Sequence, residues 1–125
     1  MNAYRRFLVL LAGLMGAAGV AAAAAGVHVN ADPALATAAS FLMLGAAAVV
    51  GASALAAAKG PGWSFATVGG GIIAAGTLLF SGTLIARVLW DVVIFPMAAP
   101  TGGTILILGW LVLGLAAFER GTRTS

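Results

Sequence analysis

Apolar residues occupy four long runs of this chain, and short polar stretches separate them. The runs cover about residues 7–27, 34–58, 65–87 and 102–118. Their only charged residue is Arg87, at the end of the third run. A helix that crosses the hydrocarbon core of a bilayer needs about 20 mostly apolar residues. The pattern therefore predicts an all-α fold: an integral membrane four-helix bundle, antiparallel from one helix to the next, that forms one domain over residues 1–125.

Residues that start or stop helices mark the connections. Asp32 and Pro33 favour a helix start, because Asp caps free N–H groups and Pro suits the first helical position. Residues 59–64, Lys-Gly-Pro-Gly-Trp-Ser, predict a tight turn at a membrane surface. Pro96 and Pro100 bracket a stretch that we expect to be irregular, so that the last and shortest helix begins near residue 102.

Basic residues near the span ends set the expected orientation, because loops rich in Lys and Arg stay in the cytoplasm. Four spans put both termini on the same side of the membrane. That side carries Arg5, Arg6, Lys59, Arg120 and Arg123, whereas the other side carries Arg87. We therefore expect cytoplasmic N- and C-termini in a multi-pass protein of the cell inner membrane.

Composition narrows the class of protein further. Hydrophobic residues make up 62% of the chain and charged residues 7%, and a soluble domain has roughly 25% charged residues. With a mean hydropathy of +1.14, a single soluble domain is excluded. The net charge of +3 comes from few basic residues, so it gives no support to nucleic-acid binding, and Arg5 and Arg6 are interpreted as charges at the membrane surface. The absence of cysteine excludes disulfides and thiolate metal sites.

Small residues indicate which helix faces meet protein. At 100° per residue the first helix gathers a small-residue face opposite Leu10 and Leu14, and close approach through small residues is how helices associate in lipid. We expect helix packing through Ala12, Gly16, Gly19, Ala23 and Gly26 of the first helix, Gly82 of the third and Gly109 of the fourth.

Candidate chemistry is sparse. Proton relays and ion-coupled transporters use ionisable residues inside the membrane, and the interiors of the four runs have none. His28 lacks the further donors that a metal site needs, and Arg87 and Asp91 have the i, i+4 spacing of a surface ion pair. We therefore expect no enzyme activity, no metal and no cofactor.

The loops on the outer side hold the polar residues that we expect to cluster. Because the fourth helix begins late, the N–H groups of Gly102 and Gly103 lie near membrane depth and need acceptors, which His28 or Asp32 could supply. The expected outer-face polar cluster comprises His28, Asp32, Arg87, Asp91, Thr101, Gly102 and Gly103. It either ties the loops together or also binds a lipid head group or a partner side chain.

Three stretches of the chain follow a known pattern. They are Gly16-Ala17-Ala18-Gly19-Val20 through Gly26-Val27-His28, then Leu79-Phe80-Ser81-Gly82-Thr83-Leu84, then Pro100-Thr101-Gly102-Gly103 followed by Leu108-Gly109-Trp110-Leu111. In this order and spacing they resemble the YgdD-like family of small four-helix inner-membrane proteins (domain of unknown function 423). The resemblance implies a four-helix integral protein of the inner membrane and carries no activity. The family's second helix typically begins with a Tyr-x-x-Tyr-His-like cluster, which Phe41-Leu42-Met43-Leu44-Gly45 replaces here, so a paired-histidine site is in doubt.

Two classes of function stay open. One is a structural or accessory subunit that packs in the lipid bilayer with itself or with other membrane subunits. The other is a passive binding or transport module that recognises a lipid head group or small solute at the outer-face polar cluster. We favour the first, because the sequence supplies packing surfaces and no catalytic chemistry.

Overall fold

The computed structural model describes residues 2–119 and contains four long helices. They are α1 (Ala3–His28), α2 (Pro33–Lys59), α3 (Phe65–Trp90) and α4 (Ala98–Gly114), and a 3-10 turn, η1 (Leu115–Phe118), extends α4. All four spans, the last counted as Ala98–Phe118, are long and apolar enough to cross a membrane. No strand occurs within residues 2–119. The prediction of an all-α four-helix membrane bundle is confirmed.

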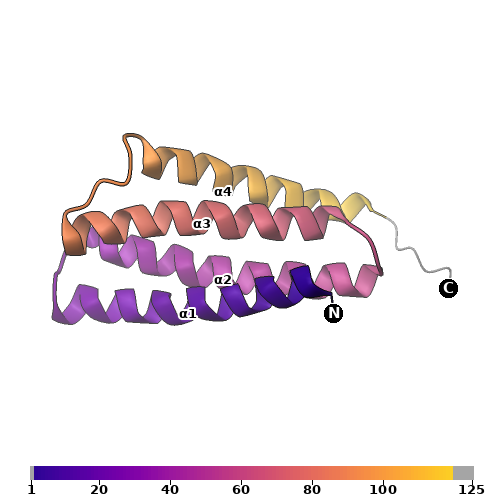
Figure 1. Ribbon diagram of the computed structural model, residues 1–125, viewed down its shortest axis with the longest axis horizontal. Coiled ribbons are helices and arrows are strands. Elements are labelled where there is room, and N and C mark those ends of the chain that lie inside the picture. The colour runs from indigo at the N-terminus through magenta and orange to yellow at the C-terminus, as the bar shows by residue number, and fades with distance from the viewer. Residues whose placement is uncertain (1, 120–125) are drawn as a thin grey trace.

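Consecutive helices run antiparallel (Figure 1). The start of α1, the α2–α3 turn and the end of η1 lie together at what we call the terminal end, and the α1–α2 and α3–α4 loops lie at the opposite end. α1 packs on α2, α2 on α3 and α3 on α4, whereas α4 has no comparable packing against α1 or α2 in the described part of the chain. One side of α4 is therefore covered by α3, and the rest faces outward.

Side-chain caps explain where three of the helices begin. Asn2 accepts a hydrogen bond from the Arg5 N–H, Asp32 from the Ala34 N–H, and Ser64 from the Thr67 N–H. Each satisfies an N–H group that has no partner within its helix. Pro33 follows the Asp32 cap at the first helical position, as the sequence predicts.

The start of α4 differs from the sequence prediction. The helix begins at Ala98 rather than near residue 102, and the irregular connection runs between Trp90 and Ala98. Pro100 lies within the first turn, where its missing N–H removes no helical hydrogen bond. The Thr101 N–H donates to the Met97 carbonyl at 2.9 Å, so Gly102 and Gly103 lie inside the helix.

The small-residue face of α1 lies against α2. A Cβ at Gly19 would come within 2.7 Å of Met43 Cγ and 3.1 Å of the Ala39 carbonyl oxygen, so the two helices approach closely there. Leu10 and Leu14 are 63% and 60% exposed on the other side of α1. Of the remaining residues on the small face, Ala12 is buried, Ala23 is half-buried, Gly16 faces Ala46 and Gly26 faces Leu35.

The α3–α4 contact is closer still, because glycines of each helix meet the backbone of the other. On α3, a Cβ added at Gly69 would lie 2.8 Å from Leu113 N, and one added at Gly76 would lie 2.6 Å from Leu106 N. On α4, a Cβ added at Gly102 would lie 2.5 Å from Phe80 N, and one added at Gly109 would lie 2.8 Å from Ile73 N. We call these four positions the glycine seam. Gly69 and Gly76 are seven residues apart, as are Gly102 and Gly109, which matches a packing repeat of two helical turns.

Gly82 does not belong to this seam. A Cβ at Gly82 would meet no atom within 4 Å, so Gly82 does not pack against another helix within residues 2–119, contrary to the expectation for helices of this chain. It lies six residues after Gly76, which turns it away from α4 at 100° per residue.

The core between the helices is apolar and finely fitted. Met15, Leu42, Val49, Ile73 and Leu106 bring side chains from all four helices into one buried cluster. In α3 the hydroxyls of Thr77 and Ser81 are fully buried without a hydrogen-bond partner in the structure. These are small side chains in a crowded space, because a Cβ at Gly45 would lie 2.7 Å from Thr77 Oγ1.

Candidate functional site

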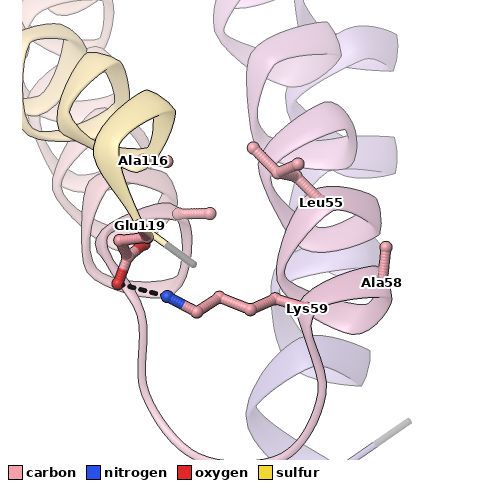
Figure 2. Close-up of a pocket in the computed structure, with 6 residues that line it drawn as sticks. Leu55, Ala58, Lys59, Ala116 and Glu119 are labelled. Atoms are coloured by element: carbon pink, nitrogen blue, oxygen red, sulfur yellow. Dashed lines mark ion pairs between the residues drawn. The ribbon is translucent and has the colours of Figure 1, made fainter. Parts of the chain in front are cut away.

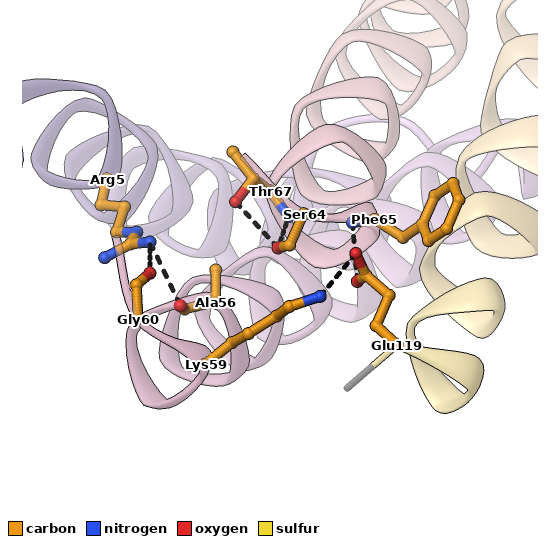
Figure 3. A network of polar contacts seen from close by, with 8 residues as sticks. All are labelled: Arg5, Ala56, Lys59, Gly60, Ser64, Phe65, Thr67 and Glu119. Atoms are coloured by element: carbon orange, nitrogen blue, oxygen red, sulfur yellow. Dashed lines mark hydrogen bonds and ion pairs between the residues drawn. The ribbon is translucent and has the colours of Figure 1, made fainter. Parts of the chain in front are cut away.

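Arg5 is a buried cation at the terminal end of the bundle. Its side chain is 7% exposed, and Nη2 donates to the carbonyl oxygens of Ala56 at 3.1 Å and Gly60 at 3.0 Å (Figure 3). The last carbonyls of a helix lack hydrogen-bond partners within the helix and carry partial negative charge. A guanidinium supplies both a hydrogen-bond donor and a positive charge. The interpretation of Arg5 as a membrane-surface charge is therefore wrong. Arg5 ties α1 to the end of α2.

Tyr4 makes the matching tie from α1 to α3. Its hydroxyl donates to the Thr67 carbonyl at 2.9 Å. The same hydroxyl lies over Gly71, where a Cβ would clash with it. Glycine at that position gives the phenol room to reach the first turns of α3.

Glu119 connects the end of α4 to two other helices. Its Oε2 lies 2.7 Å from Lys59 Nζ, and its Oε1 accepts a hydrogen bond from the Phe65 N–H at 2.8 Å (Figure 3). Both ion-pair side chains are mostly buried, with exposed fractions of 20% for Lys59 and 14% for Glu119. The carboxylate therefore satisfies the first N–H of α3 while it neutralises the last residue of α2.

The pKa of Glu119 reflects these contacts. Burial raises it, but the hydrogen bonds from Lys59 and the Phe65 N–H and the positive charge of Lys59 outweigh burial, so the pKa lies below its ordinary value of 4.5. Glu119 is thus a carboxylate at neutral pH, as its ion pair with Lys59 requires.

Together these contacts form a network that joins all four helices at the terminal end, and sequence reasoning missed it. We call Tyr4, Arg5, Lys59 and Glu119 the terminal network. A signal was present, because the expected topology puts the chain's single Lys and single Glu, Lys59 and Glu119, at the same end of the bundle. The contacts of these four side chains join different helices, so the network holds the helices in place.

At the opposite end, Asp32, Arg87 and Asp91 line one pocket of about 370 Å³ between the start of α2 and the end of α3. Leu84 and Val88 form its apolar wall. Within residues 2–119 the structure shows no ion pair of Arg87, so the expected pairing with Asp91 is wrong. Asp91 leaves the helix in a left-handed conformation, with φ 52°, which takes it out of the i, i+4 register.

The other predicted members of the outer-face polar cluster lie elsewhere. Gly102 packs on the backbone of Phe80 in α3, and Gly103 packs on the Phe80 ring. Because α4 already begins at Ala98, their N–H groups lie in a helix and do not need His28 or Asp32 as acceptors, so that reason for a cluster is wrong. His28, the last residue of α1, is exposed, and its imidazole makes no hydrogen bond or ion pair within residues 2–119.

The described part of the chain contains no group of three or more His, Asp or Glu side chains that could hold a metal ion. The pocket at the opposite end brings two carboxylates and one guanidinium to the same place. This arrangement can attract an ion or a zwitterionic group, and it offers no nucleophile with an adjacent base.

A long groove lies between α2 and α4 on the side that α3 does not cover. Two adjoining hollows, of about 460 Å³ and 240 Å³, share Leu55 and Ala116 and form what we call the α2–α4 groove. Figure 2 shows its mouth, where the Lys59–Glu119 ion pair lies beside Leu55, Ala58 and Ala116. The remaining lining residues are Ala48, Gly51, Ala52, Ala66, Leu113, Gly114 and Ala117.

Comparison with known proteins identifies the family. The family model described as "Protein of unknown function (DUF423)" matches residues 11–103, which include most of α1, all of α2 and α3 and the start of α4. The UPF0382 membrane protein SAB0533 of Staphylococcus aureus (strain bovine RF122 / ET3-1) is 38% identical over 50 residues, covering 40% of this chain and 41% of that protein. The aligned part therefore spans less than half of that relative. No solved structure matches the chain. The chain belongs to the DUF423 family, a family of membrane proteins of unknown function.

Proposed function

We propose that this protein is a structural or accessory subunit of the cell inner membrane, without catalytic activity, that packs with other membrane subunits or with itself. The observation that carries the proposal is a face of α1 that no other helix of the chain covers. Gly13, Ala17, Val20 and Ala24 share this face, and all four are exposed. A Cβ at Gly13 would meet no atom within 4 Å.

Small residues that face outward from a membrane helix favour docking of another helix. Helices in lipid associate by close backbone approach and van der Waals contact, since lipid tails are as apolar as the side chains themselves. The spacing of four, three and four residues along the α1 face is the repeat that two long helices use to interlock. Leu10 and Leu14 lie beside this face of α1, and their side chains would pack against a helix that docks there.

The polar residues of the bundle support a structural role in a second way. Tyr4, Arg5, Lys59 and Glu119 all make contacts that join helices of this chain. Side chains held in this way stabilise the fold and are unsuited to turnover. This supports the proposal that the protein is not an enzyme.

Cross-linking tests the docking face directly, because the chain contains no cysteine. We expect Gly13→Cys and Ala17→Cys, each labelled with a benzophenone maleimide, to form an adduct with a partner helix when native membranes are irradiated. Leu108→Cys, which is 53% exposed on α4, is the matched control and should give none. Mass spectrometry of the adduct then distinguishes a second copy from another subunit. Equal cross-linking at all three positions, or none at any, would overturn the proposal.

The proposed orientation places the terminal end in the cytoplasm. Arg5, Arg6 and Lys59 lie at that end and Arg87 at the other, and Arg120 and Arg123 lie outside the described residues. An impermeant maleimide added to intact cells should label Asn30→Cys and spare Trp63→Cys. The reverse pattern would invert the orientation.

Binding at the opposite end is a second candidate function, favoured by the pocket that Asp32, Arg87 and Asp91 line. Its charges fit a lipid head group or a small solute that carries both signs. We expect native mass spectrometry to show a small molecule retained by the unaltered protein and lost from Arg87→Gln. Retention by both proteins would reject this function for the pocket.

A further inference from the structure

The α2–α4 groove has the length of one membrane leaflet. It runs along α2 from Lys59 to Ala48, which at 1.5 Å per residue is about 16 Å. The hydrocarbon core of a bilayer is about 30 Å thick, so one leaflet contributes about 15 Å. Beyond Ala48 the next hollow between these helices, lined by Phe41, Phe80 and Trp110, shares no lining residue with the groove.

Polar groups occur at one end of the groove only. Lys59 and Glu119 form its mouth at the terminal end, and every other lining residue is Ala, Gly or Leu. The mouth lies at the last residue of α2 and just after η1, where the spans end and the head groups of a bilayer begin. A phospholipid has the same arrangement, with charge at the surface and an apolar chain one leaflet deep.

Two glycines make the room in the groove. Gly51 lines it from α2 and Gly114 from α4, and a Cβ at either position would meet no atom within 4 Å. α4 is held by α3 and does not close onto α2 in the described part of the chain. In a bilayer the open space is in contact with acyl chains along its whole length.

We propose that the α2–α4 groove is a phospholipid site, which holds one acyl chain of a lipid from the leaflet at the terminal end with its phosphate at the level of Lys59. The site is separate from the docking face of α1. The ion pair at the mouth carries one positive and one negative charge, which complements the phosphate and ammonium of a phosphatidylethanolamine head group.

The dimensions favour a lipid over a helix of a second copy. A spanning helix needs about 20 residues, roughly 30 Å, which is about twice the length of the groove. A helix with its side chains is also about 10 Å across, and the Lys59–Glu119 pair bridges the two walls at the mouth, so a helix would have to break that pair to pass. An acyl chain ends where its head group begins and leaves the pair in place.

Photolabelling tests the site. We reconstitute the full chain in vesicles of phosphatidylethanolamine and phosphatidylglycerol that contain a phosphatidylethanolamine with a diazirine on its acyl chain, irradiate them, and map the labelled peptides by mass spectrometry. The label should concentrate in residues 48–58 and 113–117 and exceed that on exposed residues of α1.

Variants make the test specific. Gly51→Leu and Gly114→Leu fill the groove from its two walls and should reduce its labelling to the level of the α1 face. Gly82→Leu is the matched control, because it adds the same side chain at a glycine of α3 that also has open space around it and lines neither the groove nor the docking face, and it should leave groove labelling unchanged. Circular dichroism with equal helix content confirms that the variants fold.

Three results would overturn the proposal. They are labelling in simple proportion to exposure, equal labelling of the groove in Gly51→Leu and the unaltered chain, and a cross-link between two chains through Gly51→Cys, which would show a helix in the groove. Failure of the α1 cross-linking experiment leaves this prediction unaffected, since the α1 face and the groove lie on different helices.

Discussion

The glycine seam between α3 and α4 predicts that a single added methyl group separates two helices. Gly76 tests this well, because a Cβ there would lie 2.6 Å from Leu106 N, 2.8 Å from Leu106 Cα and 3.1 Å from the Gly102 carbonyl oxygen. All three atoms belong to the backbone of α4, so no side-chain rotation relieves the contact. Gly76→Ala must therefore move α4 outward or bend one helix.

The size of the effect follows from the distances. Restoring ordinary van der Waals contact requires a shift of about 1 Å, and gaps of that size already forfeit a quarter to a half of the dispersion energy of the atoms concerned. Overpacking of a fitted core costs about 1–3 kcal/mol, whereas replacing Gly by Ala inside a helix returns about 0.5–1 kcal/mol. Gly82→Ala gains the same stabilisation from helix propensity, and its added Cβ meets no atom within 4 Å. The difference between the two variants isolates the clash, and we expect it to be about 1–3 kcal/mol.

Reversible unfolding measures this difference. Each variant is purified in mild detergent and titrated with sodium dodecyl sulfate, and the transition is followed by circular dichroism and by tryptophan fluorescence, to which Trp110 on α4 contributes. The free energy of unfolding of Gly76→Ala should fall below that of the unaltered protein, and that of Gly82→Ala should match or exceed it. Equal free energies for the two variants would refute the backbone contact between α3 and α4.

The same titration checks three further predictions. Arg5→Lys replaces the Nη2 group that donates to two carbonyls with an ammonium on a shorter side chain, and it should lower the free energy of unfolding by about 1–3 kcal/mol, whereas Arg6→Lys, at an exposed position, should change it little. Tyr4→Phe removes one hydrogen bond to α3 and should cost about 0.5–1.5 kcal/mol; no change would show that the hydroxyl bonds equally well to water. Gly19→Leu should force α1 from α2 and reduce the folded yield, and Leu14→Ile, on the exposed side, should not.

The number and order of the helices could be predicted from the sequence because insertion into a bilayer depends on summed hydropathy over about 20 residues. Local rules also located the Asp32 cap and the turn at residues 59–64. The start of α4 could not be predicted in the same way. Pro100 is a helix breaker in most positions, and whether it lies before a helix or inside its first turn depends on how the chain before it packs.

The glycines show where a one-helix pattern is insufficient. The seven-residue spacing of Gly102 and Gly109 is visible in the sequence, and so is that of Gly69 and Gly76, but only the rotation of α3 against α4 shows that these two pairs meet. Gly82 fits the small-residue pattern by type but lies off the seam. A glycine packs a helix only when it shares a face with the glycines or bulky residues of a neighbour.

The terminal network escaped prediction for a related reason. Rules for membrane topology count a basic residue by its distance from a span, and by that measure Arg5 is a surface charge. Its acceptors are the Ala56 carbonyl in the last turn of α2 and the Gly60 carbonyl just after the helix, which lie within reach because α1 and α2 are antiparallel and level at that end. The group that a charge meets at a helix end is set by tertiary alignment.

Glu119 makes the stability of the terminal network depend on pH. Its pKa lies below the ordinary value of 4.5 in the folded protein because Lys59 and the Phe65 N–H favour the charged carboxylate. A group whose pKa is depressed on folding stabilises the native state fully above its unfolded pKa, and this contribution is lost as the pH falls through the folded pKa. We therefore expect the end of α4 to loosen in that acidic range, measured as increased backbone amide exchange in residues 115–118. Glu119→Gln keeps an acceptor for the Phe65 N–H and removes the charge, so it should show the loosened exchange already at neutral pH and little change on acidification. If acid loosens both proteins to the same extent, the pH dependence arises from another group and the role given to Glu119 is wrong.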